Sequence, residues 1–158
     1  MLNNKKIVIT GIANKFSIAY GIAKSMSRNG AELAFLYQNE RLLKKIKPLA
    51  EDLGVETLVE CDVSSDASIA KAFQAIKSKW GNIDGLVHSI GFAPTDQLEG
   101  DFTEVTTREG FQIAHDISSY SFTALAKAAL PILNENSALL TLTYLGSIQS
   151  LPNYNVMG

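Results

Sequence analysis

Residues 6–37 read KIVITGIANKFSIAYGIAKSMSRNGAELAFLY, and this stretch decides the fold of the chain. Its first part, Ile7–Thr10, is β-branched and ends at Gly11, which predicts a buried strand that enters a tight turn. The apolar residues that follow recur at helical spacing up to Asn29-Gly30, and a second apolar strand is predicted over 33–37. A strand, a glycine turn, a helix and a strand in this order predict the first unit of a parallel α/β sheet.

The same alternation continues along the chain. Further helices are predicted over 40–53, 66–80 and 108–130, and further strands over 55–60, 83–89 and 137–143. Continuously apolar strands joined by helices predict an α/β fold with a Rossmann-type, doubly wound parallel sheet in one domain over residues 1–158.

Pro48 lies inside a predicted helix, so we expect a kink there or a later start of that helix. The Gly91–Thr107 connection is longer than a plain loop, which is typical of a functional or a disordered segment.

The composition excludes several classes of protein. The 158 residues include 14 basic and 16 acidic ones, so the net charge of −2 gives no electrostatic reason to bind nucleic acid or an anionic membrane. No apolar run approaches the ~18 residues that span a bilayer. Cys61 is the single cysteine, which excludes an internal disulfide and favours a reducing, cytoplasmic setting with the thiol in the core.

Several residues at predicted strand ends are candidates for binding a dinucleotide. Gly11 follows the first strand, where such folds turn backbone amides toward a diphosphate, although a plain turn is the alternative. Gln38 ends the second strand and can hydrogen-bond a ribose hydroxyl, but a neutral side chain leaves NADH and NADPH undistinguished, and a surface glutamine is the alternative. Asp62 and Val63 end the third strand near an expected adenine, with a helix N-cap as the competing role of Asp62. Gly91 ends the fourth strand and lets a ligand approach the backbone.

Two tyrosines follow the fifth predicted strand, at the sheet end where ligands collect. Tyr144 and Tyr154 are candidates for a proton donor or for a hydrogen bond that stabilises an anion, with a position in the core or at its rim as the alternative. His88 and His115 have no partner at metal-ligand spacing, so packed histidines are favoured, and no metal site is predicted.

These motifs together resemble one family. The quoted residues are Gly11, Ser17–Ala23, Glu32–Phe35, His88–Pro94, Thr107–Phe111, His115–Ser121 and Pro152–Gly158. Over all 158 residues the chain resembles the bacterial enoyl-acyl-carrier-protein reductases of fatty-acid synthesis, a divergent family of short-chain dehydrogenases/reductases.

The resemblance implies an activity and a set of site residues. NADH reduces the trans-2 double bond of an enoyl thioester on acyl carrier protein, and Tyr154 stabilises the enolate with Tyr144 as its neighbour. Ala93 is implied on the substrate. The implied NADH-binding residues are Gly11, Ser17, Ile18, Gln38, Asp62, Val63, Ile90 and Gly91. Relatives pair through helices equivalent to 108–130 and the one that follows, with Phe111, Phe122 and Leu125 among the apolar positions, so a homotetramer is implied for a full-length chain.

The resemblance also implies a missing part. The family carries a lysine seven positions after the equivalent of Tyr154, at position 161, whereas this chain ends at 158. We therefore expect the N-terminal three-fifths of such an enzyme, inactive by itself and prone to self-association through an uncovered apolar strand at 138–142. The alternative hypothesis is a catalytically silent dinucleotide-binding module.

Overall fold

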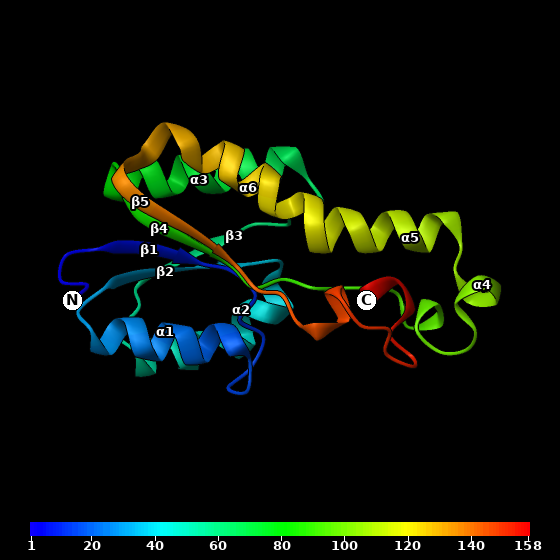
Figure 1. Ribbon diagram of the computed structural model, residues 1–158. Helices are drawn as coiled ribbons and strands as arrows, with labels where there is room; N and C mark the ends of the chain where they lie inside the picture. The colour runs from blue at the N-terminus through cyan, green and yellow to red at the C-terminus, as the bar shows by residue number, and fades with distance from the viewer.

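A computed structural model describes residues 1–158 and shows a five-stranded parallel sheet in the order β3-β2-β1-β4-β5. Helices α1 and α2 cover one face, and α3 and α6 cover the other (Figure 1). The doubly wound sheet predicted from the sequence is therefore confirmed. The strands are β1 (Lys6–Ile9), β2 (Glu32–Tyr37), β3 (Thr57–Glu60), β4 (Ile83–His88) and β5 (Leu133–Thr141). The α-helices are α1 (Ile18–Arg28), α2 (Glu40–Asp52), α3 (Asp66–Trp80), α4 (Phe102–Val105), α5 (Arg108–His115) and α6 (Ser121–Ala129).

Alternate residues of the strands are buried on opposite faces of the sheet. In β1, Val8 belongs to the cluster under α3 and α6, whereas Ile7 and Ile9 belong to the cluster under α1 and α2. Because both faces are covered there, β1 and β2 are apolar after their first residue, which is the pattern from which the parallel sheet was predicted.

Helix α2 differs from the expectation in one respect. Asn39 caps its start by accepting a hydrogen bond from the Leu42 N–H at 3.1 Å, and the helix then continues unbroken past Pro48 to Asp52. The expected later start is therefore wrong. Because Pro48 has no N–H, the carbonyl of Lys44 lacks its hydrogen bond within the helix. Lys44 and Pro48 both lie on the exposed face, so a water molecule can donate to this carbonyl instead.

The helix predicted over 108–130 is divided into α5 and α6 by a π-helical turn, Asp116–Tyr120, and ends in a 3₁₀ turn at Leu130–Ile132. Phe111 is exposed and Phe122 half-buried, but Leu125 is fully buried in the core with α3. Of the three apolar positions named for this helix, Leu125 therefore packs inside the chain, whereas Phe111 lies on its surface.

The last strand starts earlier than predicted, at Leu133 instead of Ser137, and ends at Thr141. Its first residues, Leu133–Asn136, are polar except for the leucine, and Asn136 has a φ of +66°. Pairing with β4, with a register shift between Ile83 and Gly85, draws this polar segment into the sheet. As expected, β5 is an edge strand with an exposed apolar side, which includes Leu139 and Leu140.

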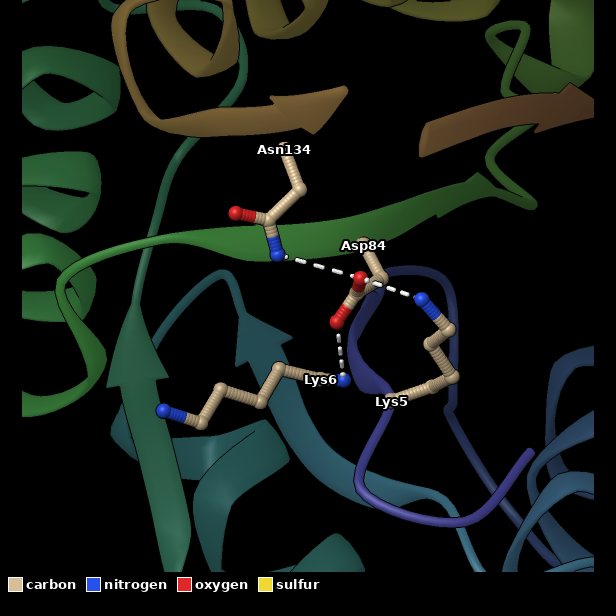
Figure 2. Close-up of polar contacts among 4 residues, drawn as sticks. All are labelled: Lys5, Lys6, Asp84 and Asn134. Atoms are coloured by element: carbon tan, nitrogen blue, oxygen red, sulfur yellow. Dashed lines mark hydrogen bonds and ion pairs between the residues drawn. The ribbon is translucent and has the colours of Figure 1, made fainter. Parts of the chain in front are cut away.

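Asp84 connects three strands at the amino end of the sheet. Its carboxylate accepts hydrogen bonds from the Lys6 N–H of β1 and the Lys5 ammonium, both at 2.9 Å, and from the Asn134 amide of β5 at 3.0 Å (Figure 2). Burial alone would raise the pKa of Asp84, but these hydrogen bonds, with that of the Lys6 N–H the largest, outweigh it and lower the pKa.

The long connection between β4 and α5 is folded. It contains a 3₁₀ turn, Thr95–Gln97, and the short helix α4. Gln97 is buried, and its amide oxygen accepts hydrogen bonds from the N–H and the hydroxyl of Thr107, at 2.9 and 3.2 Å. The connection is therefore an ordered wall beside the carboxyl ends of the strands.

Candidate active site

A cavity of about 510 Å³ lies across the carboxyl ends of four strands. In open α/β sheets this is the crevice where ligands bind. Its walls are Thr10–Ala13 after β1, Leu36–Gln38 with Leu42 at β2, Cys61–Val63 after β3, Ser89–Phe92 after β4, and Ile117 from the π-turn.

Gly11 allows the turn after β1 to pass directly against β4. Its φ is +83°, and a Cβ atom at this position would overlap the carbonyl oxygen of Ser89. The preceding Thr10 hydroxyl donates to the Val87 carbonyl at 3.1 Å and accepts from the Ser89 N–H at 3.2 Å. The two strand ends are thus held together at the centre of the cavity floor.

Two residues that the resemblance implies for the cofactor, Ser17 and Ile18, do not line the cavity. The Ser17 hydroxyl accepts hydrogen bonds from the N–H groups of Ala13 at 3.0 Å and Asn14 at 3.1 Å. It therefore folds the turn that leads from Gly11 to the start of α1. Ile18 is the first residue of that helix and is 67% exposed.

Gln38, Asp62 and Val63 line the cavity at its β2–β3 end, as the strand-end argument predicts. The Asp62 carboxylate accepts hydrogen bonds from the N–H and the hydroxyl of Ser64, at 3.0 and 2.8 Å. The N-cap of α3 is Ser65, which accepts from the Ser68 N–H, so the alternative role of Asp62 as that cap is wrong.

The single cysteine lies in the same wall. Cys61 is buried, and burial, together with the negative charge of Asp62, raises the pKa of its thiol to about 12. It thus contributes a neutral, apolar surface.

Ile90 and Gly91 line the other end of the cavity, after β4. Ala93, which the resemblance implies on the substrate, is half-buried in the connection and does not line the cavity. Sequence reasoning missed Ile117 and Ser118 of the π-turn, of which Ile117 lines the cavity and Ser118 hydrogen-bonds Phe92.

The two tyrosines come together, with ring centroids 5.3 Å apart. The Tyr144 hydroxyl donates to the Met157 carbonyl at 2.7 Å, and burial, followed by the interaction with Tyr154, raises its pKa. Tyr154 lines a separate hollow of about 400 Å³ with Phe102 and residues 146–151. A Cβ atom at Gly91 would lie 3.3 Å from the Met157 side chain, so the turn after Tyr154 touches the cavity wall.

This tyrosine segment is attached to the connection after β4. The Asn155 amide nitrogen donates to the carbonyl oxygens of Leu98 and Gly100, at 3.1 and 3.3 Å. In Figure 1 the C-terminal segment lies below α5 and beside the carboxyl ends of the strands.

His88 is buried among β4, β5 and α6. Its Nε2 lies 2.8 Å from the Ser121 hydroxyl and its Nδ1 3.1 Å from the Thr141 hydroxyl. Because the Ser121 hydroxyl donates to the Ile117 carbonyl, it accepts from Nε2–H, and Nδ1 accepts from Thr141. Desolvation lowers the pKa of His88, in keeping with this neutral form.

The prediction of packed histidines is correct for His88 and wrong for His115, which is exposed and stacks on Phe111 with ring centroids 4.0 Å apart. No three His, Cys, Asp or Glu side chains form a group that could hold a metal ion. No helix is both long and apolar enough to span a membrane.

The sheet order places the chain in the class of Rossmann-type α/β folds, and its cavity lies over the carboxyl ends of the strands, where folds of this class bind their ligands. Comparison with known sequences gives the family. The family model described as Enoyl-(Acyl carrier protein) reductase matches residues 11–158, so the chain belongs to this family.

Individual relatives agree with this assignment. The chain is 57% identical over 157 residues to the enoyl-[acyl-carrier-protein] reductase [NADH] FabI of Escherichia coli, covering 99% of this chain and 60% of that protein. The FabI of Enterococcus faecalis is 52% identical, with 99% of this chain and 62% of that protein covered. The chain thus spans about 60% of the length of the curated relatives that it matches.

Solved structures of this kind have the same fold. The NADH enoyl reductase of Aquifex aeolicus superimposes with a TM-score of 0.96 at 45% identity, covering 99% of this chain and 62% of that one. The reductase of Anaplasma phagocytophilum, solved in complex with NAD, gives a TM-score of 0.96 at 41% identity, with 99% and 60% covered.

Proposed function

We propose that residues 1–158 form the dinucleotide-binding domain and carry the tyrosines of an NADH-dependent enoyl-acyl-carrier-protein reductase. The reaction is reduction of the trans-2 double bond of enoyl thioesters in fatty-acid elongation. The observation that carries the proposal is the cavity over four strand ends in a chain that is 57% identical to an enzyme of this name.

The residues of the cavity suit a dinucleotide. At the centre of the cavity, Gly11 has no side chain that would block its backbone, so a diphosphate can approach the turn before α1. Gln38 and Asp62 offer an amide and a carboxylate at the β2–β3 end, where the adenosine ribose and adenine would lie. The nicotinamide half would then lie toward Ile90 and Gly91. When bound, NADH supplies the hydride.

Tyr154 is the proposed catalytic phenol. The residue is 43% exposed, and no residue of the chain hydrogen-bonds its hydroxyl, whereas the Tyr144 hydroxyl already donates to the Met157 carbonyl. The Tyr154 hydroxyl is therefore free to donate to the thioester carbonyl and to stabilise the negative charge that develops on its oxygen. Tyr144 lies beside Tyr154, and its hydrogen bond to the Met157 carbonyl fixes the turn that follows Tyr154.

The remaining roles follow from the family. Acyl carrier protein is the proposed carrier of the enoyl substrate, and Ala93 is the proposed substrate contact. Ser17 is proposed to contribute to the cofactor site through the turn that its hydroxyl folds, and Ile18 through the start of α1. A homotetramer is proposed for the full-length protein, supported by the exposed Phe111 and Tyr120 of the α5–α6 helix. A cytoplasmic location suits the unpaired Cys61.

The activity is tested in a joined protein, in which this chain is followed by the C-terminal part of the Escherichia coli relative. We expect it to oxidise NADH in the presence of a crotonyl thioester, and we expect the 158-residue chain to bind NADH. Tyr154→Phe in the joined protein is the matched loss-of-function variant. NADH binding without turnover in the joined protein would favour the silent binding module, and no binding by either protein would refute the proposal.

A further inference from the structure

The π-turn between α5 and α6 stands beside the cavity. The Ser121 N–H donates to the carbonyl of Asp116, five residues earlier, so this turn holds one residue more than an α-helical turn. The wider turn brings Ile117 to the cavity wall and places Ser118 against the segment that leaves β4. π-helical turns occur often at functional sites, so the side chains of this turn are candidates for a functional role.

Ser118 makes two hydrogen bonds to one residue. Its hydroxyl accepts from the Phe92 N–H and donates to the Phe92 carbonyl, both at 2.9 Å. Phe92 has no backbone hydrogen bond to any other residue, and 48% of its surface is exposed. Ser118 therefore makes both of the hydrogen bonds that hold the Phe92 backbone at the point where the cavity wall leaves the sheet.

The π-turn is also held in place by hydrogen bonds that connect it to β4. The Ser121 hydroxyl donates to the Ile117 carbonyl at 2.7 Å and lies 2.8 Å from Nε2 of His88, the last residue of β4. His88 and Ser121 are both fully buried. A closed path thus leads from the end of β4 through His88, Ser121 and the π-turn to Ser118 and back to Phe92, and it encloses Ser89–Gly91.

We infer that Ser118 is a positioning residue, which holds the Gly91–Phe92 wall in the place that the nicotinamide half of a dinucleotide requires. This inference rests on the proposed function. Ser118 itself has both hydrogen-bonding directions of its hydroxyl occupied by Phe92, so it acts through the backbone and not by contact with the ligand. The adenosine end, at Gln38 and Asp62, lies outside the enclosed path and does not depend on it.

The test compares Ser118→Ala with Ser118→Thr, which keeps a hydroxyl, and with Ser119→Ala, which alters the exposed neighbouring serine of the same turn. In the 158-residue chain, loss of two net-favourable hydrogen bonds should weaken NADH binding about tenfold in Ser118→Ala. Binding of 5′-AMP, which needs only the adenosine end, should stay within about twofold of the unmodified chain. Ser118→Thr should restore NADH binding, and Ser119→Ala should leave it unchanged.

A second measurement does not depend on a ligand. Hydrogen–deuterium exchange at the Phe92 amide should become at least about tenfold faster in Ser118→Ala and stay unchanged in Ser119→Ala, while the melting temperature of Ser118→Ala falls by no more than about 6 °C. Unchanged exchange in Ser118→Ala would overturn the inference. Faster exchange with unchanged NADH affinity, or equal weakening of NADH and 5′-AMP, would overturn the positioning role. If neither the unmodified chain nor the joined protein bound NADH, the proposed function would fail and the positioning role with it, while the exchange rates would still report whether the Ser118–Phe92 contact exists.

Discussion

Asp84→Ala should destabilise the chain without changing its affinity for NADH. The carboxylate holds β1, β4 and β5 together at the amino end of the sheet (Figure 2). The cavity lies at the opposite, carboxyl end. Its side chain is only 11% exposed, so its hydrogen bonds are largely shielded from water.

The three hydrogen bonds of Asp84 differ in their contribution to stability. The Lys5 side chain is 48% exposed, so its ion pair with Asp84 contributes less than about 1 kcal/mol. Hydrogen bonds from Lys6 N–H and the Asn134 amide to a charged acceptor contribute about 1.5–3 kcal/mol each, and water can partly replace them at this half-buried edge. We therefore expect a loss of about 2–4 kcal/mol for Asp84→Ala and less than about 1 kcal/mol for Lys5→Ala.

The pH dependence follows from the lowered pKa of Asp84. A carboxyl whose pKa is lower in the folded state stabilises the fold fully above its unfolded pKa of about 3.9. That contribution is lost as the pH falls through the lower, folded pKa. Stability should therefore fall in this acid range in the unmodified chain, and less steeply in Asp84→Asn.

Urea unfolding followed by circular dichroism, at neutral and acid pH, measures both effects. Lys5→Ala is the matched control, because it removes the ion pair and leaves the part-buried hydrogen bonds from the Lys6 N–H and the Asn134 amide in place. Equal losses in Asp84→Ala and Lys5→Ala would refute the argument that the buried donors, and not the ion pair, provide the stabilisation. So would an Asp84→Asn chain with the same acid sensitivity as the unmodified one.

Four further predictions concern the site and the open sheet edge. In the joined protein, Tyr154→Phe should lower turnover by about 10²-fold or more with NADH affinity nearly unchanged, and Tyr144→Phe should cost less; equal losses would show that the roles are misassigned. NADH should be preferred to NADPH in a competition assay, and Gln38→Arg should shift the ratio of specificity constants toward NADPH, because it adds a positive charge near the ribose. Gly11→Ala should abolish measurable NADH binding in a titration, since its Cβ displaces the Ser89 carbonyl from the cavity floor. Light scattering should show that the 158-residue chain self-associates through exposed β5, and that Leu140→Lys reduces this association; a stable, monodisperse monomer of the unmodified chain would contradict it.

Much of the fold was predictable because local pattern and tertiary burial agree. The run Ile7–Thr10 has the β-branched character of a buried strand and lies between two covered faces. The beginning of β5 was not predictable in this way, because Asn134 and Asn136 are typical of a loop. Their place in the sheet comes from pairing with β4 and from the hydrogen bond to Asp84.

In the candidate site, too, some residues were predictable from local pattern and others were not. Gln38, Asp62 and Gly91 were predictable because parallel topology alone brings strand ends to one edge of the sheet. Ser118 was missed, because a serine within a predicted helix has no distinguishing spacing. The available signal was the pair Ser118-Ser119 in mid-helix, where serine is disfavoured unless its hydroxyl has a specific backbone partner.

The buried thiol in the cavity wall bears on how this site can be inhibited. With a pKa of about 12 for Cys61, only about one molecule in 10⁵ carries a thiolate at neutral pH. Electrophiles that form covalent bonds with cysteine, and peroxides that oxidise it, should therefore react with the folded chain only slowly. A compound aimed at the β2–β3 end of the cavity gains affinity by packing a flat apolar group against this sulfur, and a cysteine-reactive group would add nothing there.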